Sequence, residues 1–156
     1  MENATGENPA TLEHLDGLAG TWRTEATHPM RPGAVISGTT SFEWLEGRRF
    51  LIWRAHHDHP DSLSVIGVDG AGDAASAAAP EGECVSHYFD SRGVSRVYKV
   101  DADATSWRFW RDWPGFSQRF TGRFSEDGET ITGTGELCQD GTTWQPDLRI
   151  TCRRER

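Results

Sequence analysis

Residues 117–125 read Ser-Gln-Arg-Phe-Thr-Gly-Arg-Phe-Ser, and this stretch decides the fold class. Its even positions carry Gln118 and two phenylalanines, whereas its odd positions carry two arginines. Because successive side chains of a strand point to opposite faces, the pattern predicts a strand whose phenylalanine face is buried. Turn residues bound it on both sides, with Trp-Pro-Gly at 113–115 and Glu-Asp-Gly at 126–128.

The same pattern extends outward from this strand in both directions. Short alternating runs separated by turn residues, with no helical periodicity between them, predict an antiparallel up-and-down meander. Closing such a sheet removes its exposed edges, so we expect an all-β barrel of about ten strands. The expected strands are residues 21–28, 36–45, 49–57, 62–68, 84–90, 94–100, 106–112, 117–125, 130–138 and 144–153. In strand 49–57 the two faces are too similar for the sequence to decide which is buried.

The sequence predicts one domain with a short N-terminal helix. Asn8 and Pro9 suit a helix start, and Leu12, Leu15 and Leu18 recur every three residues, which predicts a helix over 9–18. We expect a flexible N-terminus over 1–10, a barrel domain over 11–154 and, within it, a flexible low-complexity loop over 69–83. A chain of 156 residues is enough for one hydrophobic core.

The composition of the chain limits where in the cell we expect the protein and which partners we expect it to bind. The net charge of −8 argues against nucleic acid as a partner. The start lacks the features of a signal peptide, and no apolar run approaches the roughly 18 residues that span a membrane. Three cysteines without a C-x-x-C motif predict reduced thiols in a cytoplasmic protein. We expect a small-molecule ligand and no membrane partner, and both a monomer and a homodimer remain open.

Gly20-Thr21-Trp22, directly after the expected helix, resembles the G-x-W motif of the calycin superfamily, which includes lipocalins, fatty-acid-binding proteins and nitrobindin-like barrels. The resemblance implies that Trp22 lies at the closed base of a barrel and that an arginine from the last strand stacks across it. Arg154 falls on the face of that strand that is expected to point inward, so it is the predicted partner of Trp22. Arg153 is the alternative partner. Residues 41–47, 87–94 and 116–120 are similar to a group of bacterial calycin-like proteins, and the resemblance covers about residues 11–154.

One departure from this group concerns haem. Nitrobindin-like proteins hold haem through a histidine near the C-terminus, but residues 88–156 contain no histidine. We therefore expect no cofactor by that route; a haem-binding protein that uses His28, His56 or His87 instead is the third hypothesis.

The leading hypothesis is a binding module for a small, largely apolar or aromatic molecule, with or without an acidic group. Arg96 and Tyr98 share one face of their strand, and the fatty-acid-binding branch uses arginine and tyrosine in this way for a ligand carboxylate. The alternative for Arg96 is an outward side chain paired with a surface carboxylate. The candidate ligand-binding residues are His28, Trp44, Trp53, Arg54, His56, His87, Arg96, Tyr98, Trp110 and Gln118.

The second hypothesis is a cofactor-independent isomerase, cyclase or hydrolase-like enzyme that uses the same cavity. Its acid or base would be His56 or His87, with Tyr98 or Arg96 stabilising charge. The run His56-His57-Asp58-His59 also suits metal ligands, but neighbouring strand residues face opposite sides and Pro60 marks a loop, so we expect no metal site.

Overall fold

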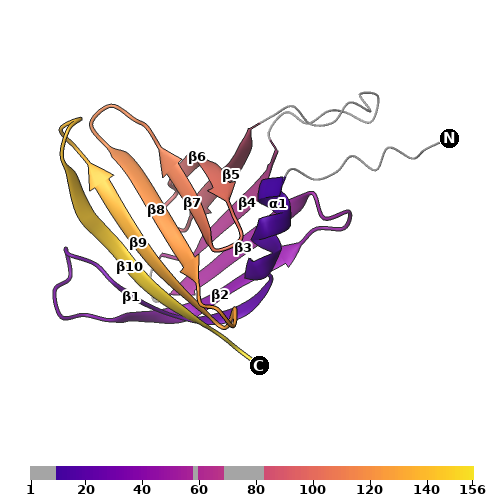
Figure 1. Ribbon diagram of the computed structural model, residues 1–156. Coiled ribbons are helices and arrows are strands. Elements are labelled where there is room, and N and C mark those ends of the chain that lie inside the picture. Colours follow the sequence, from indigo (N-terminus) through magenta and orange to yellow (C-terminus); the bar gives the residue numbers. More distant parts are fainter. Residues whose placement is uncertain (1–9, 58–59, 69–82) are drawn as a thin grey trace.

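The protein folds as a closed antiparallel β-barrel (Figure 1). The structure is a computed structural model that describes residues 10–57, 60–68 and 83–156. The expected flexible N-terminus, apart from its last residue, and nearly all of the expected loop over 69–83 lie outside the described residues. Within the described residues, ten strands follow the ring order β1-β10-β9-β8-β7-β6-β5-β4-β3-β2, so each strand pairs with its neighbours in sequence and β1 closes onto β10.

The ten predicted strands are confirmed, with boundaries that differ by a few residues at most. The elements are α1 (Ala10–His14), the 3₁₀ turn η1 (Leu15–Leu18), β1 (Gly20–Thr27), β2 (Ile36–Trp44), β3 (Phe50–His57), β4 (Ser62–Val68), β5 (Cys84–Asp90), β6 (Ser95–Ala102), β7 (Ser106–Arg111), β8 (Ser117–Phe124), β9 (Thr130–Cys138) and β10 (Trp144–Arg154). The predicted helix divides into α1 and η1, because Gly17 disfavours a continuous helix and the Ala19 N–H bonds the Asp16 carbonyl instead. No helix among the described residues is long and apolar enough to cross a membrane.

The inward phase of β8 follows the predicted alternation. Phe120 is 5% exposed, and Gly122 lies opposite Trp107 of β7. A Cβ on Gly122 would lie 2.3 Å from Trp107 Nε1, so glycine leaves the space that the indole ring occupies. The alternation that decides the fold class therefore also leaves room for Trp107, one of two fully buried tryptophans among the described residues.

The structure resolves the ambiguous phase of β3. Leu51, Trp53, Ala55 and His57 point inward, and Leu51 and Ala55 are buried. Arg54 and His56 therefore lie on the outer face of the barrel, because side chains alternate along a strand.

The closed end of the barrel is built around Trp22. Its ring is fully buried, and its Nε1–H donates to the Leu18 carbonyl over 2.8 Å. The Arg154 guanidinium carbon lies 4.2 Å from the centre of the Trp22 ring, and Arg154 also donates to the carbonyls of Ala19, Gly17 and Gly128. Trp22 and Arg154 are register partners across β1 and β10, so this contact joins the two ends of the sheet.

Replacing Arg154 by alanine is expected to lower the free energy of unfolding by about 3 kcal/mol, because the cation–π contact and charged hydrogen bonds are both lost. Urea denaturation followed by circular dichroism measures the change. Arg153→Ala is the matched control, since Arg153 is exposed and its Glu25 contact is 4.0 Å long. It should cost less than about 0.5 kcal/mol. Equal losses in the two variants would contradict the role given to Arg154.

Candidate functional site

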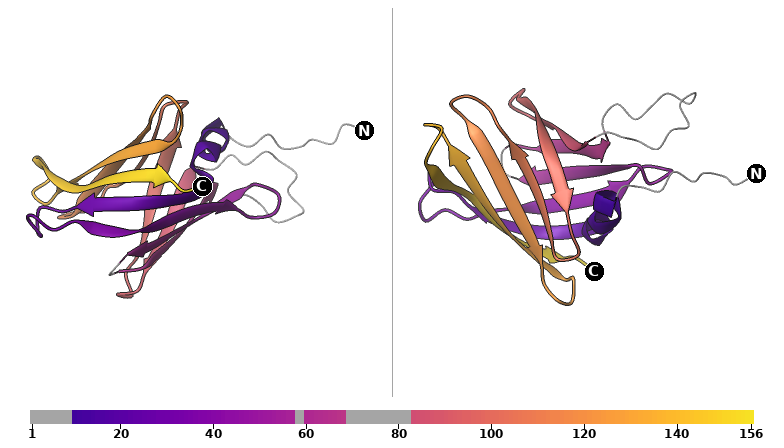
Figure 2. Two further views of the ribbon diagram at one scale, coloured as in Figure 1. Left: turned by 90° about the horizontal axis from the view of Figure 1, so that it is seen from below. Right: turned by 45° about the horizontal axis from the view of Figure 1, so that its top comes forward.

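The barrel interior contains a cavity of about 480 Å³, within the range of small-molecule sites. Figure 2 shows the strands curving around one interior, and Leu12, Leu15 and Leu18 of the helical segment pack with Trp22 in the core. The cavity is lined by inward side chains from β1 to β10 and from the segment between β1 and β2. The predicted barrel therefore encloses space that its side chains do not fill.

The deeper part of the cavity is a cluster of aromatic rings. Phe42 stacks on Trp53 with ring centres 5.3 Å apart, and Phe109 stacks on Phe120 at 4.8 Å. Trp107 lies between these pairs, with its ring centre 5.5 Å from that of Trp53 and 5.4 Å from that of Phe120. These rings present a hydrocarbon surface that suits an apolar or aromatic guest.

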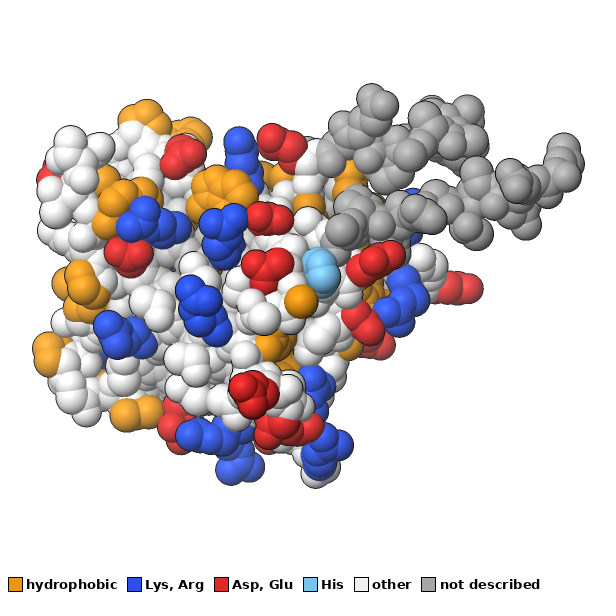
Figure 3. All heavy atoms as spheres, viewed as in Figure 1, with side chains coloured by type: hydrophobic (Ala, Val, Ile, Leu, Met, Phe, Trp, Pro, Cys, Tyr) orange, Lys and Arg blue, Asp and Glu red, His pale blue; other side chains and the backbone are white. Residues whose placement is uncertain are grey.

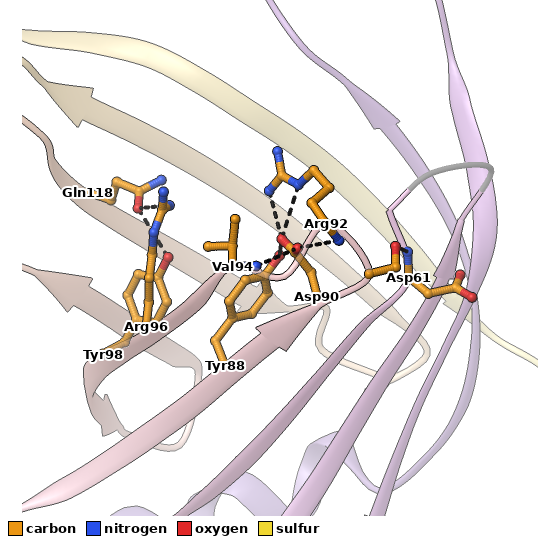
Figure 4. A network of polar contacts seen from close by, with 9 residues as sticks. Asp61, Tyr88, Asp90, Arg92, Val94, Arg96, Tyr98 and Gln118 are labelled. Carbon is orange, nitrogen blue, oxygen red and sulfur yellow. Dashed lines mark hydrogen bonds and ion pairs between the residues drawn. The ribbon is translucent and has the colours of Figure 1, made fainter.

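A polar group on β6 and β8 lies beside the aromatic rings. Arg96 Nη1 and the Tyr98 hydroxyl both donate to Gln118 Oε1, over 3.0 and 3.1 Å, and Figure 4 shows the three side chains converging. All three line the cavity. Within the described part of the chain, no carboxylate lies within ion-pair distance of the half-buried Arg96. The outward alternative for Arg96 is thus wrong, and its remaining N–H groups are available to a ligand.

A second polar network, on β5 and the turn that follows, holds the neighbouring stretch of wall (Figure 4). Asp90 accepts hydrogen bonds from the side chains of Arg92 and Tyr88 at 2.7 Å each, and from the backbone N–H groups of Arg92 and Val94. The Arg92 guanidinium holds the pKa of Asp90 well below its usual range, with further help from Tyr88 and the two backbone donors. Burial, followed by the hydrogen bond to Asp90, raises the pKa of Tyr88, so its hydroxyl stays protonated and donates.

His28 lies at the rim, where the described chain leaves β1. The Met30 backbone N–H donates to His28 Nδ1 over 3.0 Å, so Nε2 carries the proton and donates to Asp147 over 2.6 Å. Both ring nitrogens are therefore engaged, and the pair ties the end of β1 to β10. This arrangement makes His28 a structural link in the wall and leaves it no ring nitrogen for acid–base work.

The structure brings together five of the predicted ligand-binding residues and separates the other five from the cavity. His28, Trp53, Arg96, Tyr98 and Gln118 line it. Arg54, His56, His87 and Trp110 lie on the outer face, because each falls in the outward phase of its strand. Trp44 faces inward at the closed end, where its Nε1–H donates to Asp16 over 2.9 Å.

These placements also bear on the other hypotheses. His56 and His87, the predicted acid or base of an enzyme, do not reach the cavity. His57, from the predicted histidine run, does line it, whereas Asp58 and His59 lie outside the described residues. Among the described residues, no three His, Cys, Asp or Glu side chains are grouped closely enough to hold a metal ion.

Sequence reasoning missed several lining residues, among them Ser64, Ser86 and Arg92. In β5, the inward side chains Cys84, Ser86 and Tyr88 alternate with Val85, His87 and Phe89. Each set mixes polar and apolar residues, so hydropathy alone does not show which face of β5 points into the barrel. The pairing of β5 with β4, in which Ser64 lies opposite Tyr88, determines the inward face of β5.

The cysteines are free thiols in the wall and core, in agreement with the sequence prediction of reduced cysteines. Burial raises the pKa of the Cys84 thiol to about 12, and the charge of Asp101 adds to this effect. Burial also raises the pKa of Cys152, whose sulfur lies 3.5 Å from the Thr24 hydroxyl. Both groups are protonated at neutral pH and are poor nucleophiles.

Comparison with solved structures places the fold among known barrels. The structure of Rv2717c from M. tuberculosis superposes with a TM-score of 0.63, 14% sequence identity and coverage of 96% of this chain and 100% of that chain. The S-type phycobiliprotein lyase CPES from Guillardia theta gives 0.55, 9% identity and coverage of 97% and 95%. No family model and no curated protein matches the chain. The closed antiparallel barrel fits a calycin-like, lipocalin-type fold.

Asp90→Asn is expected to remove a pH-dependent part of the stability. An aspartate whose folded pKa is lowered stabilises the fold above its unfolded pKa of about 3.9, and this contribution is lost as pH falls towards the folded value. The difference in unfolding free energy between wild type and variant should therefore be largest above about pH 5 and shrink below pH 4. Urea denaturation at a series of pH values measures it. A difference that stays constant down to pH 2.5 would show that the Asp90 charge is unimportant.

Proposed function

We propose that this protein binds a small, largely apolar or aromatic acid, with the rings of the ligand among the deep aromatic side chains and its acidic group on Arg96 and Tyr98. The observation that carries the proposal is the half-buried Arg96 inside the cavity without a carboxylate partner in the described residues. A guanidinium removed from water is costly unless an anion or other acceptors satisfy it. A ligand carboxylate would accept from Arg96 and the adjacent tyrosine hydroxyl at once.

The charge distribution supports an anionic guest. The protein carries a net charge of −8, and on the face seen in Figure 3 acidic and basic side chains are interspersed. Among the described residues, the charged side chains that line the cavity are instead mostly arginines, namely Arg31, Arg92, Arg96 and Arg119, against the one carboxylate of Asp147. Arg92 and Arg119 pair with Asp90 and Glu136, which leaves Arg31 and Arg96 to attract an anion.

The apolar part of the proposal rests on the ring cluster. Tyr98 joins the two regions, because its ring centre lies 5.2 Å from that of Phe109 while its hydroxyl bonds Gln118. A ligand whose acid contacts Arg96 would therefore extend directly onto Phe109 and Trp53. The lyase in the comparison is named for phycobiliproteins, and this supports a small-molecule role for a barrel of this kind.

We also propose that the protein belongs to the calycin superfamily and works in the cytoplasm. The G-x-W tripeptide with Arg154 over Trp22 supports the first assignment, and three free cysteines support the second.

Arg96→Met is expected to weaken the binding of 2-naphthoate by between about tenfold and 100-fold, because a charge-assisted contact is lost while the length of the side chain is kept. Quenching of tryptophan fluorescence measures the dissociation constant, since Trp53 and Trp107 line the cavity.

Arg123→Met is the matched control for Arg96→Met. Arg123 is exposed on the outer face of β8, so this variant changes the net charge equally and should bind 2-naphthoate as the wild type does. The uncharged 2-naphthamide should bind wild type and Arg96→Met with similar affinity. Undiminished binding of 2-naphthoate by Arg96→Met would refute the proposed anchor.

A further inference from the structure

The cavity wall is polar on one half of the barrel and apolar on the other. On β4, β5, β6 and β8, the inward side chains that line the cavity include Ser64, Ser86, Arg96, Tyr98 and Gln118. On the opposite half, β10, β1, β2 and β3 contribute inward side chains that are mainly hydrocarbon, such as Ala26, Ile36, Ala55 and Ile150. In the strand order β4, β5 and β6 are neighbours, and so are β10, β1, β2 and β3, while β7, which carries Trp107 and Phe109, separates β6 from β8. The polar strand β5 therefore lies opposite the apolar strand β10 in the ring.

Hydroxyl groups on the apolar half satisfy one another. The hydroxyls of Thr24 and Thr40 are 2.7 Å apart and form a hydrogen bond, and His28 is paired with Asp147. These polar groups need no partner from a ligand. Apart from Trp53 Nε1–H, which is buried without a hydrogen-bond partner among the described residues, the apolar half therefore offers a guest mainly van der Waals contact.

Ser64 and Ser86, on the polar half, differ in this respect. They are only 2% and 3% exposed, and they line the cavity. Neither hydroxyl forms a hydrogen bond within the part of the chain that the structure describes. The cross-strand row of Ser64 also contains Tyr88 and Arg96, and Ser86 is paired with Tyr98, so both hydroxyls lie beside the proposed anchor for the acid.

The two hydroxyls face the cavity, so a ligand oxygen in reach would form hydrogen bonds with them in place of water. We propose that the ligand is an aromatic or polycyclic acid that carries hydroxyl or carbonyl groups along one edge, which faces Ser64 and Ser86, and hydrocarbon along the other. This inference rests on the proposed function and specifies its ligand class. It excludes a simple fatty acid, whose chain has no oxygen to offer this wall.

Three probes with the same acid group test the proposal. They are 2-naphthoate, its same-edge diol 4,5-dihydroxy-2-naphthoate, and its opposite-edge diol 4,8-dihydroxy-2-naphthoate. The same-edge diol should bind the wild-type protein about tenfold more tightly than either other probe, because only it can place both hydroxyls on the polar wall. Isothermal titration calorimetry measures all three affinities.

The double variant Ser64→Ala/Ser86→Ala should lose this preference and leave the affinity for 2-naphthoate unchanged. The two hydroxyls have no partner in the described part of the protein, so their removal should not impair folding, which circular dichroism checks. Ser37→Ala/Ser95→Ala is the matched control, since both serines are exposed on outer faces, and it should keep the preference.

Each outcome bears on the two proposals separately. Binding of 2-naphthoate without preference for the same-edge diol would overturn this inference and leave the proposed function intact. A preference that survives in Ser64→Ala/Ser86→Ala would also overturn it, because the hydroxyls would then not be its cause. Failure of all three acids to bind would overturn both.

Discussion

The structure depends on the closure of β1 onto β10, secured where Arg154 covers the Trp22 ring. These two residues are separated by almost the whole chain, yet they are register partners, and the guanidinium also binds carbonyls of the segment before β1. With this contact in place the sheet has no open edge among the described strands, and the buried Trp22, Leu15 and Leu18 close one end. Everything proposed about an enclosed ligand follows from that geometry.

Closure also determines how polarity is distributed inside. In an up-and-down barrel each strand neighbours the next one in sequence, so consecutive strands with polar inward residues form one continuous wall. Here β4 to β6 bring Ser64, Ser86 and Arg96 to one side, while β10, β1 and β2 bring aliphatic side chains to the other. Both the order of the strands and the individual lining residues therefore determine which ligands the cavity suits.

The sequence predicted the number and position of the strands because turn residues and period-two alternation are local features. It also predicted Arg154 over Trp22, through the resemblance to calycins. It failed where both faces of a strand carry similar residues. In β3, Arg54 and Trp53 could each face inward, and in β7 the aromatic residues Phe109 and Trp110 are adjacent. The register between neighbouring strands, which sets Phe42 opposite Trp53 and Phe109 opposite Phe120, decides these cases, and the pattern of a single strand does not contain that register.

The central claim is that Arg96 holds the acid of an enclosed aromatic ligand. A crystal structure of the protein with 2-naphthoate tests it most directly. We predict the carboxylate about 3 Å from both Arg96 and the Tyr98 hydroxyl, with the naphthalene rings against Phe109 and Trp53. Density for the acid on the outer surface, or inside the barrel with its carboxylate directed away from Arg96, would contradict the account.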